Sequence, residues 1–132
     1  MGEKDKNKTE IIYKDLSFEI IGALFDVYNE LGPRHPERIY CNAVEQALKN
    51  KGLKFNQQLY CKIEYEGKRV GLYYPDFVVE NKMVLELKVR PRFSKQDFAQ
   101  VKKYLKVENL KLGILATFCS DGVKFSRVVN LY

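Results

Sequence analysis

Apolar residues at helical spacing predict two helices at the start of the chain. Between residues 15 and 31 they recur every three or four positions, as on the buried side of an amphipathic helix. These positions are Leu16, Ile20, Leu24, Val27 and Leu31. Gly32 and Pro33 then give a stop signal, because glycine often follows the last helical turn and proline cannot continue it. Pro36 suits the first position of a second helix, which Gly52 would close.

Alternating apolar and polar residues predict strands in the middle of the chain. We expect a strand over residues 59–65, a turn at residues 66–68, and a second strand that runs without interruption over residues 69–79. A further turn at residues 81–82 leads into a third strand over residues 83–89.

The last third of the chain predicts one more helix and two strands. Ser94, with Asp97 three residues later, resembles a capping box that opens a helix ending near residue 106. An apolar strand follows over residues 112–118, and a last strand covers residues 123–131. The expected order is therefore α-α-β-β-β-α-β-β.

The chain length favours one α/β domain over residues 11–132, preceded by a disordered polar tail over residues 1–10. A hydrophobic content of 45% is enough for a packed interior. No apolar run approaches about 20 residues, so no membrane-spanning helix is expected. The polar tail also lacks the apolar segment of a secretory signal.

The net charge of +6 comes from one segment. Residues 82–106 hold eight basic side chains and two acidic ones, while the rest of the chain has equal numbers of basic and acidic side chains. One interpretation is a solvated helix face beside a basic loop. The other is a binding surface for a polyanion, most commonly nucleic acid.

Cysteine and histidine content excludes several kinds of site. Cys41, Cys61 and Cys119 are odd in number and widely spaced, which fits a reducing, cytoplasmic compartment. His35 is the only histidine, so a Cys/His zinc site of ordinary spacing is excluded. It lies in a loop-like segment, where we expect a loop residue rather than a ligand.

The pattern Pro75-Asp76, nine residues, then Glu86-Leu87-Lys88 is the sharpest chemical feature. If the hairpin turns about residue 81, Asp76 lies opposite Glu86, and opposed residues share a face with Cβ atoms about 4.5–5.5 Å apart. This register requires a loop of odd length or a bulge. Lys88 lies on the same face as Glu86 because side chains alternate along a strand.

Two ionised carboxylates this close repel each other by about 4 kcal/mol at about 4 Å and an effective dielectric constant of about 20. The pair therefore needs a cation or a raised pKa, and Mg²⁺ prefers such carboxylate oxygens. The alternative is a ladder of charges on an exposed sheet face. The apolar runs that flank the pattern are typical of central strands, which favours a site.

These residues resemble the signature of the PD-(D/E)xK nuclease superfamily, and the chain resembles its small GxxExxY-type members from about residue 16 onward. The resemblance implies a restriction-endonuclease-like core, an α/β fold with a mixed central sheet flanked by helices. It also implies a metal-dependent nuclease that acts on nucleic acid, with DNA favoured. The residues that carry it are Glu37, Tyr40, Asp76, Glu86, Lys88, Gln100 and Tyr104.

By this resemblance, Asp76, Glu86 and the Leu87 carbonyl would hold Mg²⁺ or Mn²⁺, and Lys88 would orient the attacking water. Glu37 would assist with the metal. It falls on the side of its helix that carries the apolar stripe, although an acidic residue in a first turn also complements the helix dipole. Tyr40, one turn later, is as consistent with the core as with the site.

Gln100 and Tyr104 are neighbours on the third predicted helix, and we expect both to lie beside its apolar stripe rather than within it. The alternative is a polar margin of an amphipathic helix. By resemblance they would line the site. Five basic residues would contact phosphates without reading sequence, namely Arg90, Arg92, Lys95, Lys102 and Lys103.

One position departs from the GxxExxY pattern, because Arg34 stands where the motif has glycine. The conformation of the loop before Glu37 is thus an open question. The chain beyond the core is too short for a specificity domain, so we expect little sequence preference. The competing interpretation is a non-catalytic nucleic-acid-binding or protein-interaction module on the same fold. A homodimer is compatible with the sequence.

Overall fold

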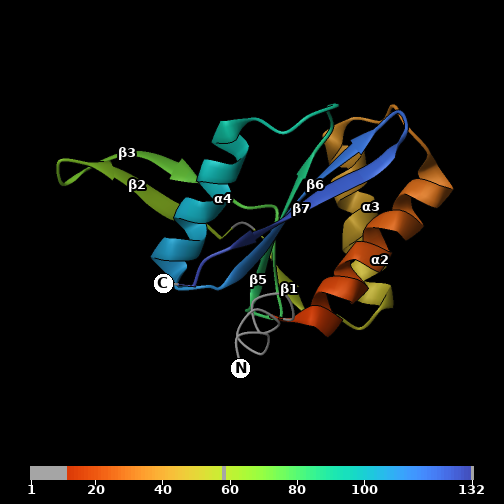
Figure 1. The fold of residues 1–132 in the computed structure, drawn as a ribbon, viewed down its shortest axis with the longest axis horizontal. Helices are drawn as coiled ribbons and strands as arrows, with labels where there is room; N and C mark the ends of the chain where they lie inside the picture. The colour runs from red at the N-terminus through yellow and green to blue at the C-terminus, as the bar shows by residue number, and fades with distance from the viewer. Residues whose placement is uncertain (1–11, 58, 132) are drawn as a thin grey trace, which may run out of the picture.

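The computed structural model describes residues 12–57 and 59–131 (Figure 1). Within these residues the chain forms three helices, α2 (Lys14–Leu31), α3 (Glu37–Asn50) and α4 (Lys95–Glu108). All three predicted helices are confirmed, and α3 begins directly after Pro36. None of the helices in this part of the chain is long and apolar enough to cross a membrane. The predicted polar tail lies outside the described residues.

Five strands of the described part form a mixed sheet in the order β1-β4-β5-β6-β7. β5 and β6 run parallel, and the other neighbouring strands run antiparallel. Their bounds are β1 (Phe55–Asn56), β4 (Phe77–Val79), β5 (Met83–Lys88), β6 (Leu112–Cys119) and β7 (Gly122–Val129). The mixed central sheet matches the predicted fold class.

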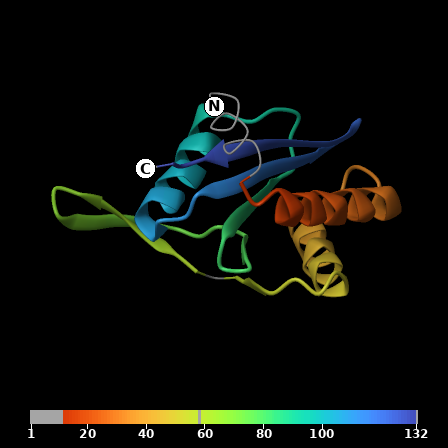
Figure 2. The same cartoon turned by 60° about the horizontal axis from the view of Figure 1, so that its bottom comes forward.

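Helices cover both faces of this sheet. Figures 1 and 2 show α2 and α3 on one face and α4 on the other. Side chains alternate along β5, so Leu85 and Leu87 pack in the core below α2 and α3, whereas Val84 packs toward α4. Glu86 therefore lies on the α4 face, near the end of a strand whose first three residues are buried and apolar.

The continuous strand predicted over residues 69–79 is wrong. The structure divides it into β3 (Lys68–Tyr73) and β4, which belong to different sheets. Pro75 lies between them, and because proline has no backbone N–H it cannot continue a ladder of hydrogen bonds. The strand prediction missed β1, because two residues are too few to show an alternation of apolar and polar positions.

β3 pairs with β2 (Cys61–Tyr65) to form a separate two-stranded sheet. This β2–β3 hairpin projects from the body of the molecule beside α4 (Figures 1 and 2). Cys61 and Tyr73 at its base are buried with Tyr104 of α4 in one core cluster. The hairpin is thus fixed to the helix at its base and exposed at its tip.

The start of α4 is fixed by the predicted capping box. The Ser94 side chain accepts a hydrogen bond from the Asp97 backbone N–H, and Asp97 accepts one from the Ser94 N–H. Farther along, α4 lies so close to β6 that a Cβ added at Gly113 would come within 2.8 Å of Val101. Both features fix the position of α4 on the sheet.

Candidate active site

The register between β4 and β5 is the one predicted from the sequence. Phe77 pairs with Leu85, and Val79 pairs with Met83, around a three-residue turn. Extending the ladder by one pair brings Asp76 opposite Glu86. Two hydrogen bonds hold them there. The Asp76 N–H donates to Glu86 Oε1 at 3.0 Å, and the Leu87 N–H donates to Asp76 Oδ2 at 2.7 Å.

The environment of this carboxylate pair opposes two negative charges. Burial raises the pKa of Glu86 to about 8, the charge of Asp76 adds to the rise, and Lys88 lowers it. Burial also raises the pKa of Asp76, against the hydrogen bond from the Leu87 N–H that lowers it. The two groups thus share a deficit of positive charge that a cation would offset.

Lys88 lies between the carboxylate pair and a third buried carboxylate. Its Nζ is 3.5 Å from Glu86 Oε2 and 3.9 Å from Asp97 Oδ1. Asp97 also pairs with the Arg90 guanidinium. Burial acts to raise the pKa of Asp97, but the Ser94 backbone hydrogen bond and the charges of Arg90 and Lys88 outweigh it and lower the pKa.

Asp97 therefore links the helix cap to the site, a role that the sequence analysis missed. It was one of only two acidic residues in the basic segment 82–106, which was the available signal. The backbone of Arg90 is itself fixed. Its N–H donates to Thr117 Oγ1 at 3.0 Å, and the Thr117 hydroxyl donates to the Arg90 carbonyl at 2.6 Å.

α3 contributes Glu37 and Cys41 from the other side. Glu37 is exposed to solvent at the first position of α3. Partial burial raises its pKa, the charge of Asp76 raises it further, and Lys88 and Arg90 lower it. The carboxylate is therefore within the electrostatic range of the pair.

Cys41, one turn after Glu37, lies against Asp76. Burial raises the pKa of its thiol to about 12, and the charges of Asp76, Glu37 and Glu86 contribute. The thiol is therefore neutral at ordinary pH. The sequence pattern gave no signal of this contact between Cys41 and the pair.

The chemistry of the donor set suits a divalent cation. Within residues 12–57 and 59–131 no group of three or more His, Cys, Asp or Glu is arranged to hold a metal ion. Mg²⁺ needs less than that, since it binds through one or two carboxylates together with water and substrate phosphates. Asp76 and Glu86 supply the two carboxylates, and the Leu87 carbonyl follows directly in the chain.

Tyr73, at the end of β3, lies behind the pair and was missed by the sequence analysis. Burial raises the pKa of its hydroxyl far above the usual range, and the charges of Glu86 and Asp76 add to this. Its ring meets that of Tyr104 edge to face, with centroids 6.0 Å apart. No sequence signal could identify it, because its position depends on where the hairpin packs.

The prediction that Tyr104 lies beside the core is wrong. Tyr104 is 3% exposed and packs with Val101 and Leu105, because the β2–β3 hairpin covers that side of α4. Gln100 is half-buried at the margin, as predicted. It lines a recess of about 280 Å³ with Tyr73.

Tyr40 and His35 have structural contacts. The Tyr40 hydroxyl donates to the Gly32 carbonyl at 2.6 Å, and its ring stacks on Phe118 with centroids 4.1 Å apart. His35 Nε2 lies 2.9 Å from the Leu31 carbonyl oxygen. Of the two interpretations of Tyr40, the contacts favour the core, and His35 is a loop residue as expected.

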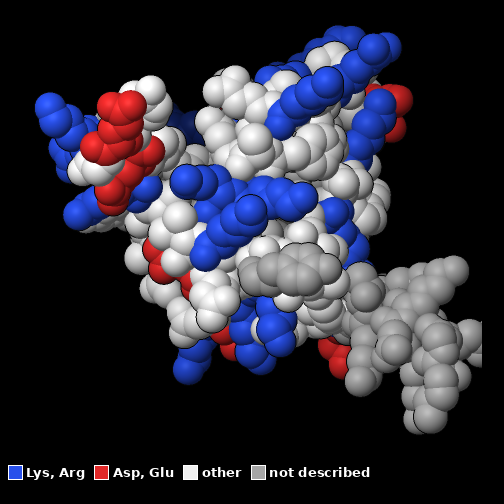
Figure 3. Space-filling model, turned by 60° about the vertical axis from the view of Figure 1, so that its left-hand side comes forward, with Lys and Arg blue, Asp and Glu red and all other residues white. Residues whose placement is uncertain are grey.

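Five of the eight basic residues of segment 82–106 fall into two groups. Lys88 and Arg90 reach the buried carboxylates. Lys95, Lys102 and Lys106 are exposed along the outer side of α4, where their spacing places them in one row. Figure 3 shows Lys and Arg gathered on this side of the molecule, whereas the β2–β3 hairpin carries both signs of charge.

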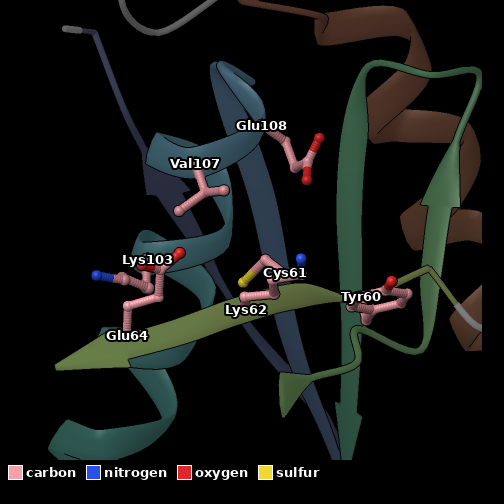
Figure 4. Close-up of a pocket in the computed structure, with 7 residues that line it drawn as sticks. All are labelled: Tyr60, Cys61, Lys62, Glu64, Lys103, Val107 and Glu108. Atoms are coloured by element: carbon pink, nitrogen blue, oxygen red, sulfur yellow. The ribbon is translucent and has the colours of Figure 1, made fainter. Parts of the chain in front are cut away.

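A hollow of about 510 Å³ lies between β2 and α4, away from the carboxylate pair (Figure 4). Its lining residues are Tyr60, Cys61, Lys62, Glu64, Lys103, Val107 and Glu108. Two lysines and two glutamates cancel in charge, so this hollow offers a polyanion no net attraction.

Comparisons with known proteins agree with this arrangement. A family model described as the PD-(D/E)XK nuclease superfamily matches residues 14–128. Among solved structures, the chain is similar to the crystal structure of SSO0001, with a TM-score of 0.54 and 18% sequence identity. The likeness covers 70% of this chain and 49% of that chain, so the chain spans about half of that protein's length. No curated protein matches. Together with the mixed sheet, these findings confirm the predicted restriction-endonuclease-like core.

Proposed function

The chain belongs to the PD-(D/E)XK nuclease superfamily, and on this premise we propose that its carboxylate pair hydrolyses phosphodiester bonds in nucleic acid, with DNA favoured and little sequence preference. One observation carries the proposal. Asp76 and Glu86 are held together by two hydrogen bonds, from the Asp76 N–H to Glu86 and from the Leu87 N–H to Asp76, with the Lys88 ammonium 3.5 Å from Glu86. The raised pKa of both carboxyls suits a site that is completed by a cation.

The residues that would hold Mg²⁺ or Mn²⁺ are Asp76, Glu86 and the Leu87 carbonyl, with Glu37 assisting. When bound, such an ion supplies positive charge at the phosphate and lowers the pKa of a water molecule. Two observations support this role for Glu37: its side chain is exposed, and the charge of Asp76 raises its pKa.

Lys88 is the group of this chain that would act on the reacting phosphate. Its ammonium can orient the attacking water and stabilise negative charge that develops on the phosphate oxygens. Asp97, which accepts a hydrogen bond from the Arg90 guanidinium, forms an ion pair with Lys88 at 3.9 Å and helps to keep its ammonium in place. The buried ion pairs thus restrict Lys88 before substrate arrives.

Contacts to the nucleic-acid backbone would come from Gln100 and the exposed cations Arg92, Lys95, Lys102 and Lys103, which lie on and before α4. Tyr104 would contribute only indirectly, through its contact with Tyr73. Contacts with phosphates give affinity without reading sequence. This supports weak sequence preference.

We also propose kinship with the GxxExxY-type members of the superfamily. Arg34, which replaces the motif's glycine, has a φ of 72°. This left-handed conformation is the one that glycine adopts without strain. The replacement of glycine by Arg34 therefore changes the side chain at this position but keeps the backbone conformation that suits the motif.

The test is cleavage of end-labelled single-stranded, duplex and branched DNA and RNA with Mg²⁺, Mn²⁺ or a chelator. We expect cation-dependent cleavage that falls by about 10²- to 10³-fold in Asp76→Asn and Lys88→Met. Lys106→Met, an exposed lysine on α4, is the matched control and should keep its rate. Binding without cleavage by the wild type would instead support the non-catalytic module. Cleavage that survives both substitutions would refute the site.

A further inference from the structure

The Tyr73 hydroxyl is buried without a hydrogen-bond partner. Only 7% of the residue is exposed. Within the described residues, its Oη is the one buried side-chain oxygen or nitrogen that lacks a partner. A buried polar group left unpaired costs about 1–3 kcal/mol, so such groups are uncommon and call for an explanation.

Packing alone does not explain the hydroxyl. The aromatic ring fills the space between the hairpin base and α4, where it meets Tyr104 and belongs to a cluster with Cys61 and Val84. A phenylalanine ring would fill the same space without desolvating a hydroxyl. What remains to be explained is why an O–H group is placed beside the carboxylate pair.

The fold directs this hydroxyl toward Glu86. Tyr73 is the last residue of β3, three residues before Asp76, and its side chain lies on the α4 face of the sheet together with Glu86. The charges of Glu86 and Asp76 act on the hydroxyl, which faces Glu86 without making a hydrogen bond of normal geometry. A small reorientation of the Glu86 carboxylate would supply the missing partner.

We propose that Tyr73 is a positioning residue, whose hydroxyl donates a hydrogen bond to Glu86 when a divalent cation occupies the carboxylate pair. This inference rests on the proposed function. An ionised carboxylate has about four acceptor sites. In the structure Glu86 accepts from the Asp76 N–H and faces Lys88, so capacity for a further donor remains.

Tyr73 is suited to act as a donor, because its hydroxyl is buried and has no hydrogen-bond partner among the described residues. Residues behind a metal ligand fix its orientation, and their removal commonly lowers metal affinity by about 10- to 100-fold. Tyr104 would support the same contact by holding the Tyr73 ring. Tyr104 would thus have a supporting role, although it does not itself reach the carboxylates.

Tyr73→Phe tests the proposal because it removes only the hydroxyl. The metal-free variant should unfold at the same temperature as the wild type or at a higher one, since it loses an unpaired buried group. In isothermal titration its affinity for Mn²⁺ should fall by about tenfold or more. Its cleavage rate at saturating substrate should fall, while its KM for the nucleic acid stays unchanged.

Tyr40→Phe is the matched control. Its hydroxyl is paired with the Gly32 carbonyl, so this variant should lose stability and keep its affinity for Mn²⁺. A Tyr73→Phe variant that binds Mn²⁺ as tightly as the wild type would overturn the proposal, and so would a wild type that binds no divalent cation. If the wild type binds Mn²⁺ but cleaves nothing, the nuclease proposal fails. The ratio of the Mn²⁺ affinities of the wild type and Tyr73→Phe then still tests the proposed role of Tyr73.

Discussion

Two carboxylates lie on either side of Lys88 and are almost equally buried, yet their surroundings differ. Asp97 at the start of α4 is 4% exposed, and Glu86 near the end of β5 is 5% exposed. Asp97 has Ser94, Arg90 and Lys88 as partners, and its pKa is lowered in spite of burial. Glu86 shares its space with Asp76, and its pKa is raised to about 8.

The difference shows how one fold uses the same chemical group in two ways. A buried carboxylate that is fully surrounded by donors and cations belongs to the framework and stabilises it. One that is paired with a second carboxylate is short of positive charge, and it becomes a place where a cation binds. Lys88 contacts both, so it connects the framework to the site.

The largest expected effect is on catalysis. Glu86→Gln should lower the cleavage rate on the order of a thousandfold, because it removes one of the two charges that hold the cation. Its stability without metal at pH 8 should equal or exceed that of the wild type, since the amide avoids the repulsion from Asp76. Urea unfolding beside a cleavage assay measures both. A large loss of stability would show that Glu86 is as structural as Asp97.

The pH dependence of stability should have opposite signs at the two groups. The pKa of Glu86 is raised on folding, so its favourable contribution is present at low pH and is lost as pH rises from about 4.5 to about 8. A tenfold change in proton affinity is worth about 1.4 kcal/mol, so this loss amounts to a few kcal/mol. Asp97 has a lowered pKa, so its contribution is lost as pH falls below about 4.

Thermal unfolding of the metal-free protein between pH 5 and 8 measures the first effect. The decline should be much smaller in Glu86→Gln, where the raised pKa of Asp76 remains, and it should be suppressed by Mn²⁺ in the wild type. A decline of the same size in Glu86→Gln would assign the pH dependence to another group.

Asp97→Asn should act mainly on stability. It weakens the cap of α4, removes the carboxylate that pairs with Arg90, and leaves Lys88 with Glu86 alone, which costs about 2–3 kcal/mol. Ser94→Ala, which removes only the cap side chain, should cost about 1 kcal/mol. Mn²⁺ affinity should persist in both variants. Loss of Mn²⁺ binding in a stable Asp97→Asn variant would remove the distinction between the two carboxylates.

Arg34→Gly should give the smallest effect and leave both carboxylates unchanged. A left-handed conformation costs a non-glycine residue about 1–2 kcal/mol, but glycine also makes the unfolded chain more flexible. The net expectation is a gain of up to about 1 kcal/mol in the free energy of unfolding. A loss of stability would indicate that the Arg34 side chain makes a contribution larger than the backbone strain.

The residues that could be predicted from the sequence are those set by local pattern. Alternation along two strands and the position of one turn were enough to place Asp76 opposite Glu86, and helix-cap chemistry was enough to begin α4 at Ser94. These features depend on spacing within about ten residues.

The contacts that were missed depend on the packing of distant segments. Tyr73 and Tyr104 meet only because the chain passes from one sheet to another at Pro75. The alternating pattern predicted one continuous strand across that point. Cys41 reaches Asp76 from a helix more than thirty residues away in the chain. Contacts of this kind follow from the fold, so no short pattern reports them.

The length of the turn at residues 80–82 sets the strand register on which the whole site depends. Glu80 and Asn81 both have left-handed backbones there, and Glu80 is tied at both ends to Lys54, with its N–H on the Lys54 carbonyl and its carboxylate on the Lys54 N–H. One residue more or fewer in this turn would move every side chain of β4 to the opposite face. Asp76 would then point into the apolar layer below α2 and α3. Length at this turn is therefore as restrictive for the site as the identity of its carboxylates.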